Sequence, residues 1–88
     1  MTKCPLLLKM FPVRMKIETT QEIGALIRSR RKLAKLSIAG LAEMIPCSPR
    51  LLGEVERGKR NVSLAVVLNL CAALGIDLYA EERKGDER

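Results

Sequence analysis

The sequence predicts a single all-α domain, and three observations support this prediction. The 88-residue chain is long enough for only one hydrophobic core. Four segments combine helix caps or helix breakers with apolar positions at helical spacing. Aromatic residues make up only 2% of the chain, so aliphatic side chains must form the core. We divide the chain into an arm and short strand over 1–18, a helical domain over 19–75, and a strand and charged tail over 76–88.

Positive charge is concentrated in the first two-thirds of the chain. Residues 1–62 carry 13 basic and 5 acidic side chains, a net charge of +8, whereas residues 63–88 carry a net charge of −2. This distribution favours one electropositive face and a polyanionic partner such as nucleic acid.

Several residue types that enzymes and exported proteins use are missing or scattered. The chain has no histidine, and its three cysteines, Cys4, Cys47 and Cys71, lack the spacing of a metal site or a disulfide framework. We therefore expect no catalytic residues, no bound metal and no cofactor. The apolar stretch 5–11 is interrupted by Lys9 and is too short to span a membrane. We expect a cytoplasmic, nucleoid-associated protein.

The elements before the middle of the chain are a strand and a long helix. Apolar and charged residues alternate over 13–18, which predicts a short strand. A threonine cap at Thr19 or Thr20, followed by Glu22, predicts the start of a helix of about fifteen residues. That helix carries a basic run that includes Arg28, Arg31 and Lys32.

Two short helices follow, with a tight turn between them. The first begins at Ser37, which can cap it, and stops at Pro46. The second begins after Ser48 with Pro49 in its first turn, and Gly58 closes it. This is the helix-turn-helix arrangement, in which the second helix of the pair enters the DNA major groove.

The fourth predicted helix is apolar on nearly every side. Residues 63–76 include no charged residue, and an alternating strand follows over 76–80. The apolar surface of such a helix must be buried, and a small monomer leaves part of that surface exposed to solvent. We therefore expect a homodimer in which the two terminal strands lie at or near the interface, although a central position in a small bundle is the alternative. The residues that we place in the interface are Val66, Leu70, Ile76 and Leu78.

The two short helices carry a family resemblance. Residues 36–43 read LSIAGLAE and residues 48–59 read SPRLLGEVERGK. These stretches resemble the lambda-repressor/Cro-like helix-turn-helix family, also called the XRE family, and the LAE triplet and the ERGK ending are the most distinctive marks. The resemblance implies a lambda-repressor-like domain of four to five helices that binds DNA.

One branch of that family is the nearest in pattern. Residues 20–28 (TQEIGALIR), 30–32 (RRK) and 72–78 (AALGIDL) look like the HipB branch, so the resemblance covers residues 19–79. HipB-like proteins are antitoxins that repress their own operon and bind a HipA-like kinase toxin. The implied partners are a pseudo-palindromic double-stranded operator, a second copy of the chain and such a kinase, and no membrane.

The helix-turn-helix arrangement assigns roles to particular side chains. The start of the second short helix projects toward the groove floor, and its candidate base contacts are Pro49, Arg50, Leu51 and Glu54. A guanidinium can hold guanine O6 and N7 with two hydrogen bonds, whereas Glu54 either accepts from cytosine N4 or holds Arg50 in place. The candidate phosphate contacts are Ser37, Ser48, Arg57, Lys59, Arg60 and Asn61.

Other positions bear on the fold and on the strength of DNA binding. By resemblance, Arg31 and Glu56 form a buried ion pair that is structural. The chain departs from the family at Ile38, where glutamine is common and grips phosphate, and at Lys35 and Pro46, where glycine is usual. These departures predict weaker or differently oriented docking. The alternative function is therefore a protein-interaction module that neutralises a kinase toxin with residual DNA binding.

Overall fold

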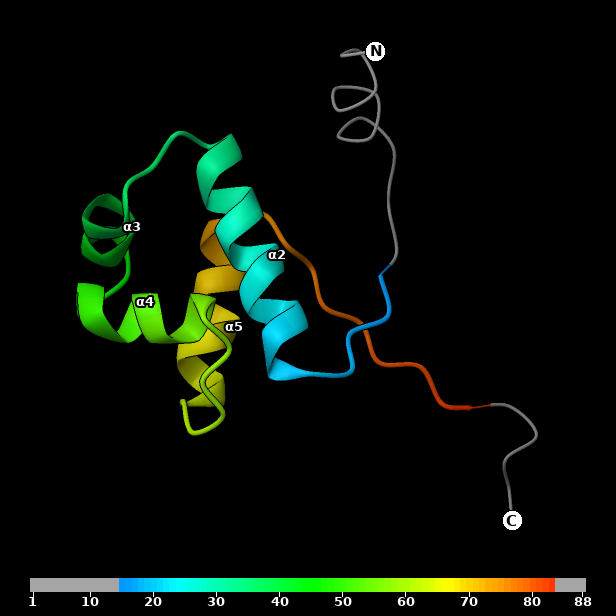
Figure 1. Ribbon diagram of the computed structural model, residues 1–88. Coiled ribbons are helices and arrows are strands. Elements are labelled where there is room, and N and C mark those ends of the chain that lie inside the picture. The colour runs from blue at the N-terminus through cyan, green and yellow to red at the C-terminus, as the bar shows by residue number, and fades with distance from the viewer. Residues whose placement is uncertain (1–14, 84–88) are drawn as a thin grey trace.

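The computed structural model describes residues 15–83, and these residues form an all-helical domain (Figure 1). Its helices are α2 (Thr20–Leu33), α3 (Ile38–Met44), α4 (Pro49–Glu56) and α5 (Leu64–Ala73). They confirm the four predicted helices. The predicted arm over 1–12 and the end of the charged tail lie outside the described residues.

The start of each helix is set by a hydroxyl cap. Thr19 caps α2, and the Glu22 carboxylate accepts the backbone N–H of Thr19 in return, which completes a capping box. The other three helices each begin after a serine whose hydroxyl accepts the backbone N–H three residues later; these serines are Ser37, Ser48 and Ser63. Each cap satisfies a backbone donor that the first helical turn leaves unpaired.

Three helices end on a residue with left-handed backbone. These residues are Lys35, Gly58 and Gly75, with φ of 60°, 88° and 77°. After each of them, the next backbone N–H bonds to a carbonyl five residues back, as in the 2.8 Å bond from Ile76 to Cys71. Gly75 thus closes α5, which ends at Ala73, within the uncharged stretch that the sequence predicts to be helical. Lys35 adopts a conformation that suits glycine better.

The core is aliphatic, as the composition predicts, and it lies between all four helices. Its largest fully buried side chains are Ile27, Leu41, Leu52, Leu70 and Cys71. Tyr79, the aromatic residue in the described part of the chain, lies at the surface. Leu70 has no exposed surface within its own chain, so its predicted place in a dimer interface is wrong: the side chain is already covered by the core.

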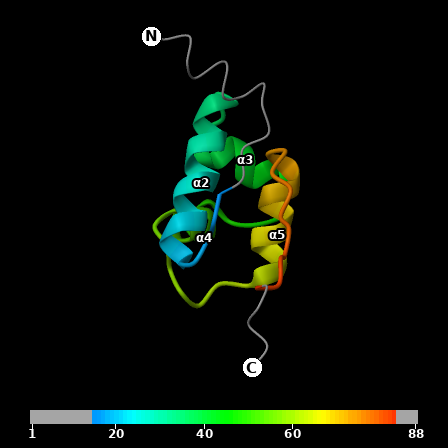
Figure 2. The ribbon, with the colours of Figure 1, turned by 90° about the vertical axis from the view of Figure 1, so that its right-hand side faces the viewer.

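The predicted strands are absent from the described residues. Residues 15–18 and 76–80 have no strand structure, and residues 13 and 14 lie outside the described part. The two segments cross in Figure 1 but stand apart in Figure 2, and among the described residues no backbone hydrogen bond joins them. Alternation of apolar and charged residues over five or six positions indicates a segment that is able to form a strand. An isolated pair of short strands is only marginally stable in water. The strand prediction is therefore wrong for the single chain.

The apolar helix α5 is partly buried and partly exposed. Val67, Leu70 and Cys71 face the core, whereas Leu64 and Leu68, four residues apart, are 68% and 46% exposed. The helix thus packs centrally on one side and presents apolar side chains on the other, while its cover by a second copy stays a prediction. Within residues 15–83, no helix is long and apolar enough to cross a membrane.

Close packing between α2 and α4 depends on Gly24. A Cβ at this buried position would clash with the carbonyl oxygens of Val55 and Glu56, which belong to the backbone of α4 and have little freedom to move. The absence of a side chain therefore lets the two helices approach each other where they cross.

We predict that Gly24→Ala lowers the free energy of unfolding by about 3 kcal/mol, because the added methyl group must push the two helices apart. The matched control is Gly53→Ala in the interior of α4, where the nearest atom to an added Cβ is the flexible tip of Arg57, at 3.4 Å. This control should stabilise the protein by about 0.5–1 kcal/mol through helix propensity. Urea unfolding of both variants measures the difference, and equal effects would contradict the packing argument.

Candidate nucleic-acid interface

The segment from α3 to α4 forms a tight turn that exposes one side of α4. Ile45 ends α3 in an extended conformation, and Ser48 caps α4 three residues later. Leu52 and Val55 point from α4 into the core. The opposite side of α4 carries Arg50, Glu54 and Arg57, which share a face because they are spaced by four and three residues. A charged face on the second helix of the pair is thus open to a partner.

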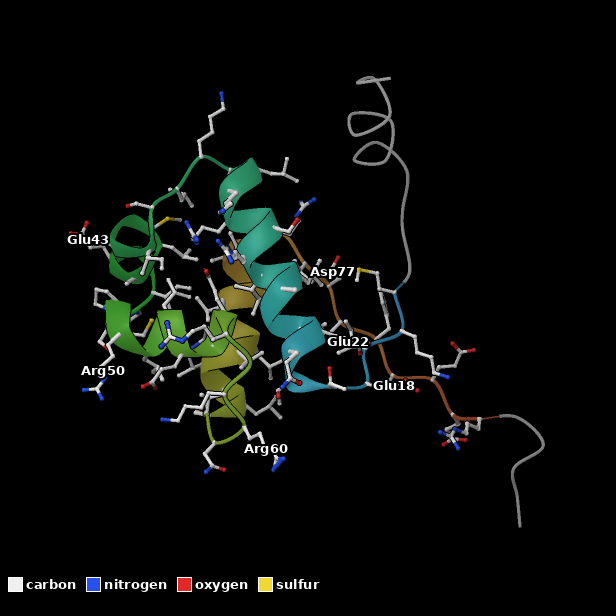
Figure 3. The ribbon with its side chains drawn as sticks, in the orientation of Figure 1. Glu18, Glu22, Glu43, Arg50, Arg60 and Asp77 are labelled. Carbon is white, nitrogen blue, oxygen red and sulfur yellow. The ribbon has the colours of Figure 1, made fainter. Side chains whose placement is uncertain are left out.

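An ion-pair network organises the charged face of α4. Glu54 lies between two cations, with one carboxylate oxygen 3.6 Å from Nε of Arg50 and the other 3.2 Å from Nζ of Lys59. The hydrogen bond from Lys59 and the charges of Arg50 and Arg57 hold the pKa of the Glu54 carboxyl below its usual value. The Arg50 side chain is 88% exposed and projects away from the helix (Figure 3). Glu54 therefore stays ionised and restrains Arg50 while leaving its guanidinium accessible.

The remaining residues at the start of α4 differ in accessibility. Pro49 is exposed and Leu51 is half-buried, so both retain surface beside Arg50. The Ser48 hydroxyl accepts the backbone N–H of Leu51 at 3.0 Å, and the Ser37 hydroxyl plays the same role at the start of α3. Each hydroxyl keeps its own O–H, which remains available to donate to a phosphate oxygen.

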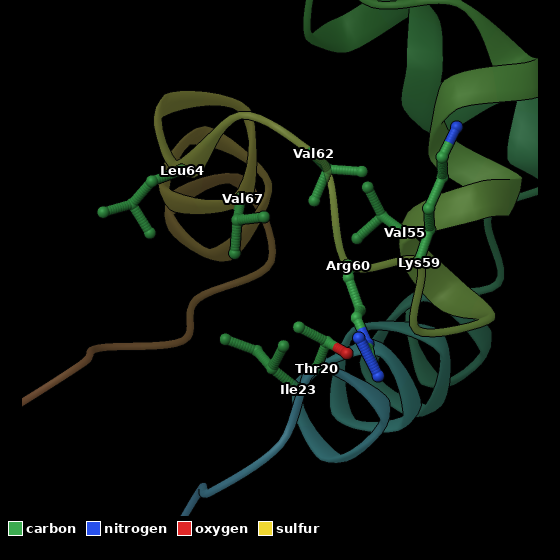
Figure 4. Close-up of a pocket in the computed structure, with 8 residues that line it drawn as sticks. All are labelled: Thr20, Ile23, Val55, Lys59, Arg60, Val62, Leu64 and Val67. Atoms are coloured by element: carbon green, nitrogen blue, oxygen red, sulfur yellow. The ribbon is translucent and has the colours of Figure 1, made fainter.

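The loop after α4 brings further basic side chains to the surface, in two directions. Lys59 bonds back to Glu54, and Arg60 and Asn61 are exposed. The loop covers an apolar cavity of about 160 Å³ between the start of α2, the loop and α5, and Arg60 extends over its edge toward Thr20 (Figure 4). Lys59 thus belongs to the charged face of α4, whereas Arg60 lies beside the start of α2.

Arg31 and Glu56 form a buried ion pair between α2 and α4. Their side chains are 9% and 5% exposed, and two parallel hydrogen bonds of 2.6 and 3.0 Å join them. A third bond runs from Nη1 of Arg31 to the backbone carbonyl of Leu36, at 2.8 Å. The hydrogen bonds and charge of Glu56 raise the pKa of Arg31 further above its ordinary value. Arg31 therefore keeps its charge, and the pair fixes the end of α4 against α2.

A second cavity was not found by sequence reasoning. It has a volume of about 260 Å³ and opens between α2, the start of α3 and α4. Arg28, Gly53 and Arg57 contribute to its lining, beside the Arg31–Glu56 pair. Arg28 precedes Arg31 by three residues, which places both on one side of α2. That Arg28 lines the same cavity as Gly53 depends instead on how α2 and α4 cross. Spacing alone gives only the first of these facts.

The described residues contain no group of histidine, cysteine and carboxylate side chains that could hold a metal ion. Cys47 and Cys71 are free thiols, and burial raises the pKa of the Cys71 thiol. Cys71 is therefore held in its protonated, unreactive form inside the core.

The chain belongs to the helix-turn-helix domain family, of the lambda-repressor (XRE) type, because the model of that family matches residues 22–84. The matched range contains α3, α4, α5 and all but the first two residues of α2, together with the charged face of α4 and the Arg31–Glu56 pair. No curated protein matches the chain. The family is one of DNA-binding domains, which agrees with the exposed, charged side of α4.

Proposed function

We propose that the protein is a sequence-specific DNA-binding repressor that inserts α4 into the major groove. The observation that carries this proposal is the outward face of α4, where Arg50, Glu54 and Arg57 are held by a helix that the core fixes in place. The net charge of +6 supplies a general attraction for the duplex.

Each side chain at this face has a proposed role. Arg50 donates to the O6 and N7 acceptors of a guanine, and Glu54 positions Arg50 or accepts from a cytosine beside it. Pro49 and Leu51 lie against the base edges. The backbone contacts, which give affinity without reading sequence, are Ser37, Ser48, Arg57, Lys59, Arg60 and Asn61.

We propose that two copies of the chain bind one pseudo-palindromic operator. The exposed Leu64 and Leu68 share one face of α5, and together with the exposed Leu78 they offer the apolar surface that a second copy would cover. Val66 and Ile76, also proposed for the interface, pack partly against the core and keep some exposed surface. Large exposed apolar side chains gathered on one helix favour an interface. Two α4 helices about 34–36 Å apart would then read half-sites one duplex turn apart.

We further propose that the repressor is a HipB-like antitoxin of a toxin–antitoxin operon, which autoregulates that operon and binds a HipA-like kinase toxin. The stretches at residues 20–32 and 72–78, which look like the HipB branch, support this assignment. The second candidate function is neutralisation of the kinase by contact alone. It is favoured by the start of α3, where Ile38, Ala39 and Gly40 offer no polar side chain to a phosphate.

We predict that Arg50→Ala removes most of the preference for the upstream DNA of the chain's own gene over a scrambled duplex, a loss of about 1–3 kcal/mol. Lys59→Ala should instead weaken all duplexes alike and reduce the dependence of log K on log salt by about 0.9. Fluorescence anisotropy across a salt series measures both effects. If wild type shows no preference at any salt but still binds and inhibits a purified HipA-like kinase, the second candidate function replaces the first.

For the dimer, we predict that wild type sediments as a dimer at micromolar concentration and that Leu68→Glu sediments as a monomer, because a buried, unpaired carboxylate is costly in an apolar interface. The matched control is Met44→Glu, which introduces the same charge at an exposed apolar residue of α3 and should leave the dimer intact. Analytical ultracentrifugation makes the measurement. A monomeric wild type would refute the proposed interface.

A further inference from the structure

The cavity between α2, α3 and α4 has unbalanced positive charge. Three arginines and one glutamate line it, together with Ile38 and Gly53. Arg31 and Glu56 satisfy each other at its wall. Among residues 15–83, neither Arg28 nor Arg57 forms an ion pair, although the Glu54 carboxylate lies near Arg57, so the lining of this cavity carries more positive than negative charge. A cavity of this charge is suited to an anion.

The cavity adjoins the charged face of α4, because Arg57 belongs to both. Arg57 shares that face with Arg50 and Glu54, and its charge contributes to lowering the pKa of Glu54. Gly53, which lacks a Cβ, lies against the Arg57 guanidinium and leaves it room to rest on the helix, where an added Cβ would approach Nη1 to 3.4 Å. The cavity is thus a continuation of the surface that carries the candidate base contact.

The distance along α4 fits the dimensions of a DNA groove. Arg57 follows Arg50 by seven residues, which corresponds to about 10 Å at 1.5 Å per residue. The major groove is about 12 Å wide between its phosphate backbones. When Arg50 reaches base edges inside the groove, Arg57 therefore lies near the level of the backbone.

We propose that Arg28 of α2 and Arg57 at the end of α4 together bind one phosphate of the DNA backbone in this cavity. The proposal rests on the proposed DNA-binding function and extends it to a helix outside the helix-turn-helix pair. It also accounts for the apolar start of α3: Ile38 forms part of the cavity wall, and the two guanidinium groups supply the hydrogen bonds that its side chain lacks.

The test compares the salt dependence of operator binding in single and double variants. Arg28→Gln and Arg57→Gln should each reduce the slope of log K against log salt by up to about 0.9, the value for one phosphate contact. Because both side chains hold the same phosphate, the double variant should lose clearly less affinity than the product of the two single losses. Arg28→Lys, which keeps the charge, should keep the slope.

The matched control is Arg30→Gln, which makes the same change on the same helix. The Arg30 guanidinium lies beside Gly75 at the end of α5, where Nη2 is 3.8 Å from the position of a Cβ on that glycine. This variant should leave the salt slope unchanged. Thermal unfolding of each variant separates loss of binding from loss of fold.

A second readout uses the wild-type protein and modified DNA. A neutral methylphosphonate is placed at one backbone position after another along the operator. At one position the methylphosphonate should lower the DNA affinity of wild type by about the same factor as Arg28→Gln does. At that position it should not lower the affinity of the Arg28→Gln variant any further.

The outcomes separate this proposal from the proposed function. Two results would overturn the phosphate site while Arg50 still reads the operator. One is an unchanged salt slope in Arg28→Gln, and the other is that the effects of methylphosphonate and of Arg28→Gln on affinity are additive at every backbone position. Loss of kinase binding with unchanged DNA binding in Arg28→Gln also overturns it, in favour of an acidic protein partner. A wild-type protein without any sequence preference overturns both proposals.

Discussion

The position of α4 depends on the buried ion pair between Arg31 and Glu56. Removing two charges from water is costly, and here the cost is offset because both carboxylate oxygens accept from the guanidinium and a third N–H donates to Leu36. The core beneath is aliphatic and held by contacts that have little directional preference. The ion pair adds a contact with a defined geometry, which orients α4 relative to α2. Gly24 lets the two helices come close enough for this ion pair to form.

This arrangement lets one short helix serve both the core and a partner. Leu52 and Val55 anchor the inner side of α4, Glu56 ties its end to α2, and the opposite side is left to Arg50 and its counter-ion Glu54. The proposed contacts with the bases therefore use side chains outside the core, whereas two of the proposed phosphate contacts, Ser37 and Ser48, also cap α3 and α4. The same separation holds for α5, whose inner side fills the core while its outer side is proposed to meet a second copy of the chain.

Local chemistry made much of this structure predictable, and contacts across space made the rest unpredictable. The serine caps, Pro49 and Gly58 act within one turn of their own helix, so their positions in the sequence locate α3 and α4. The prediction of two strands was wrong because alternation of apolar and charged residues shows that a segment is able to pair but does not supply a partner strand. Leu70 was misplaced because an apolar helix does not reveal which of its sides faces inward. Arg28 and Gly53 meet only through the crossing of α2 and α4, which spacing along the chain does not encode.

The central claim, that the Arg31–Glu56 pair fixes α4 on the fold, is tested most directly by a double-mutant cycle in stability. Arg31→Met, Glu56→Leu and the double variant are unfolded in urea alongside wild type. Each single change should cost about 3–5 kcal/mol, because it leaves a buried charge without its partner, and the double variant should cost much less than their sum. Additive losses, or single losses below about 1 kcal/mol as at exposed ion pairs, would contradict the claim.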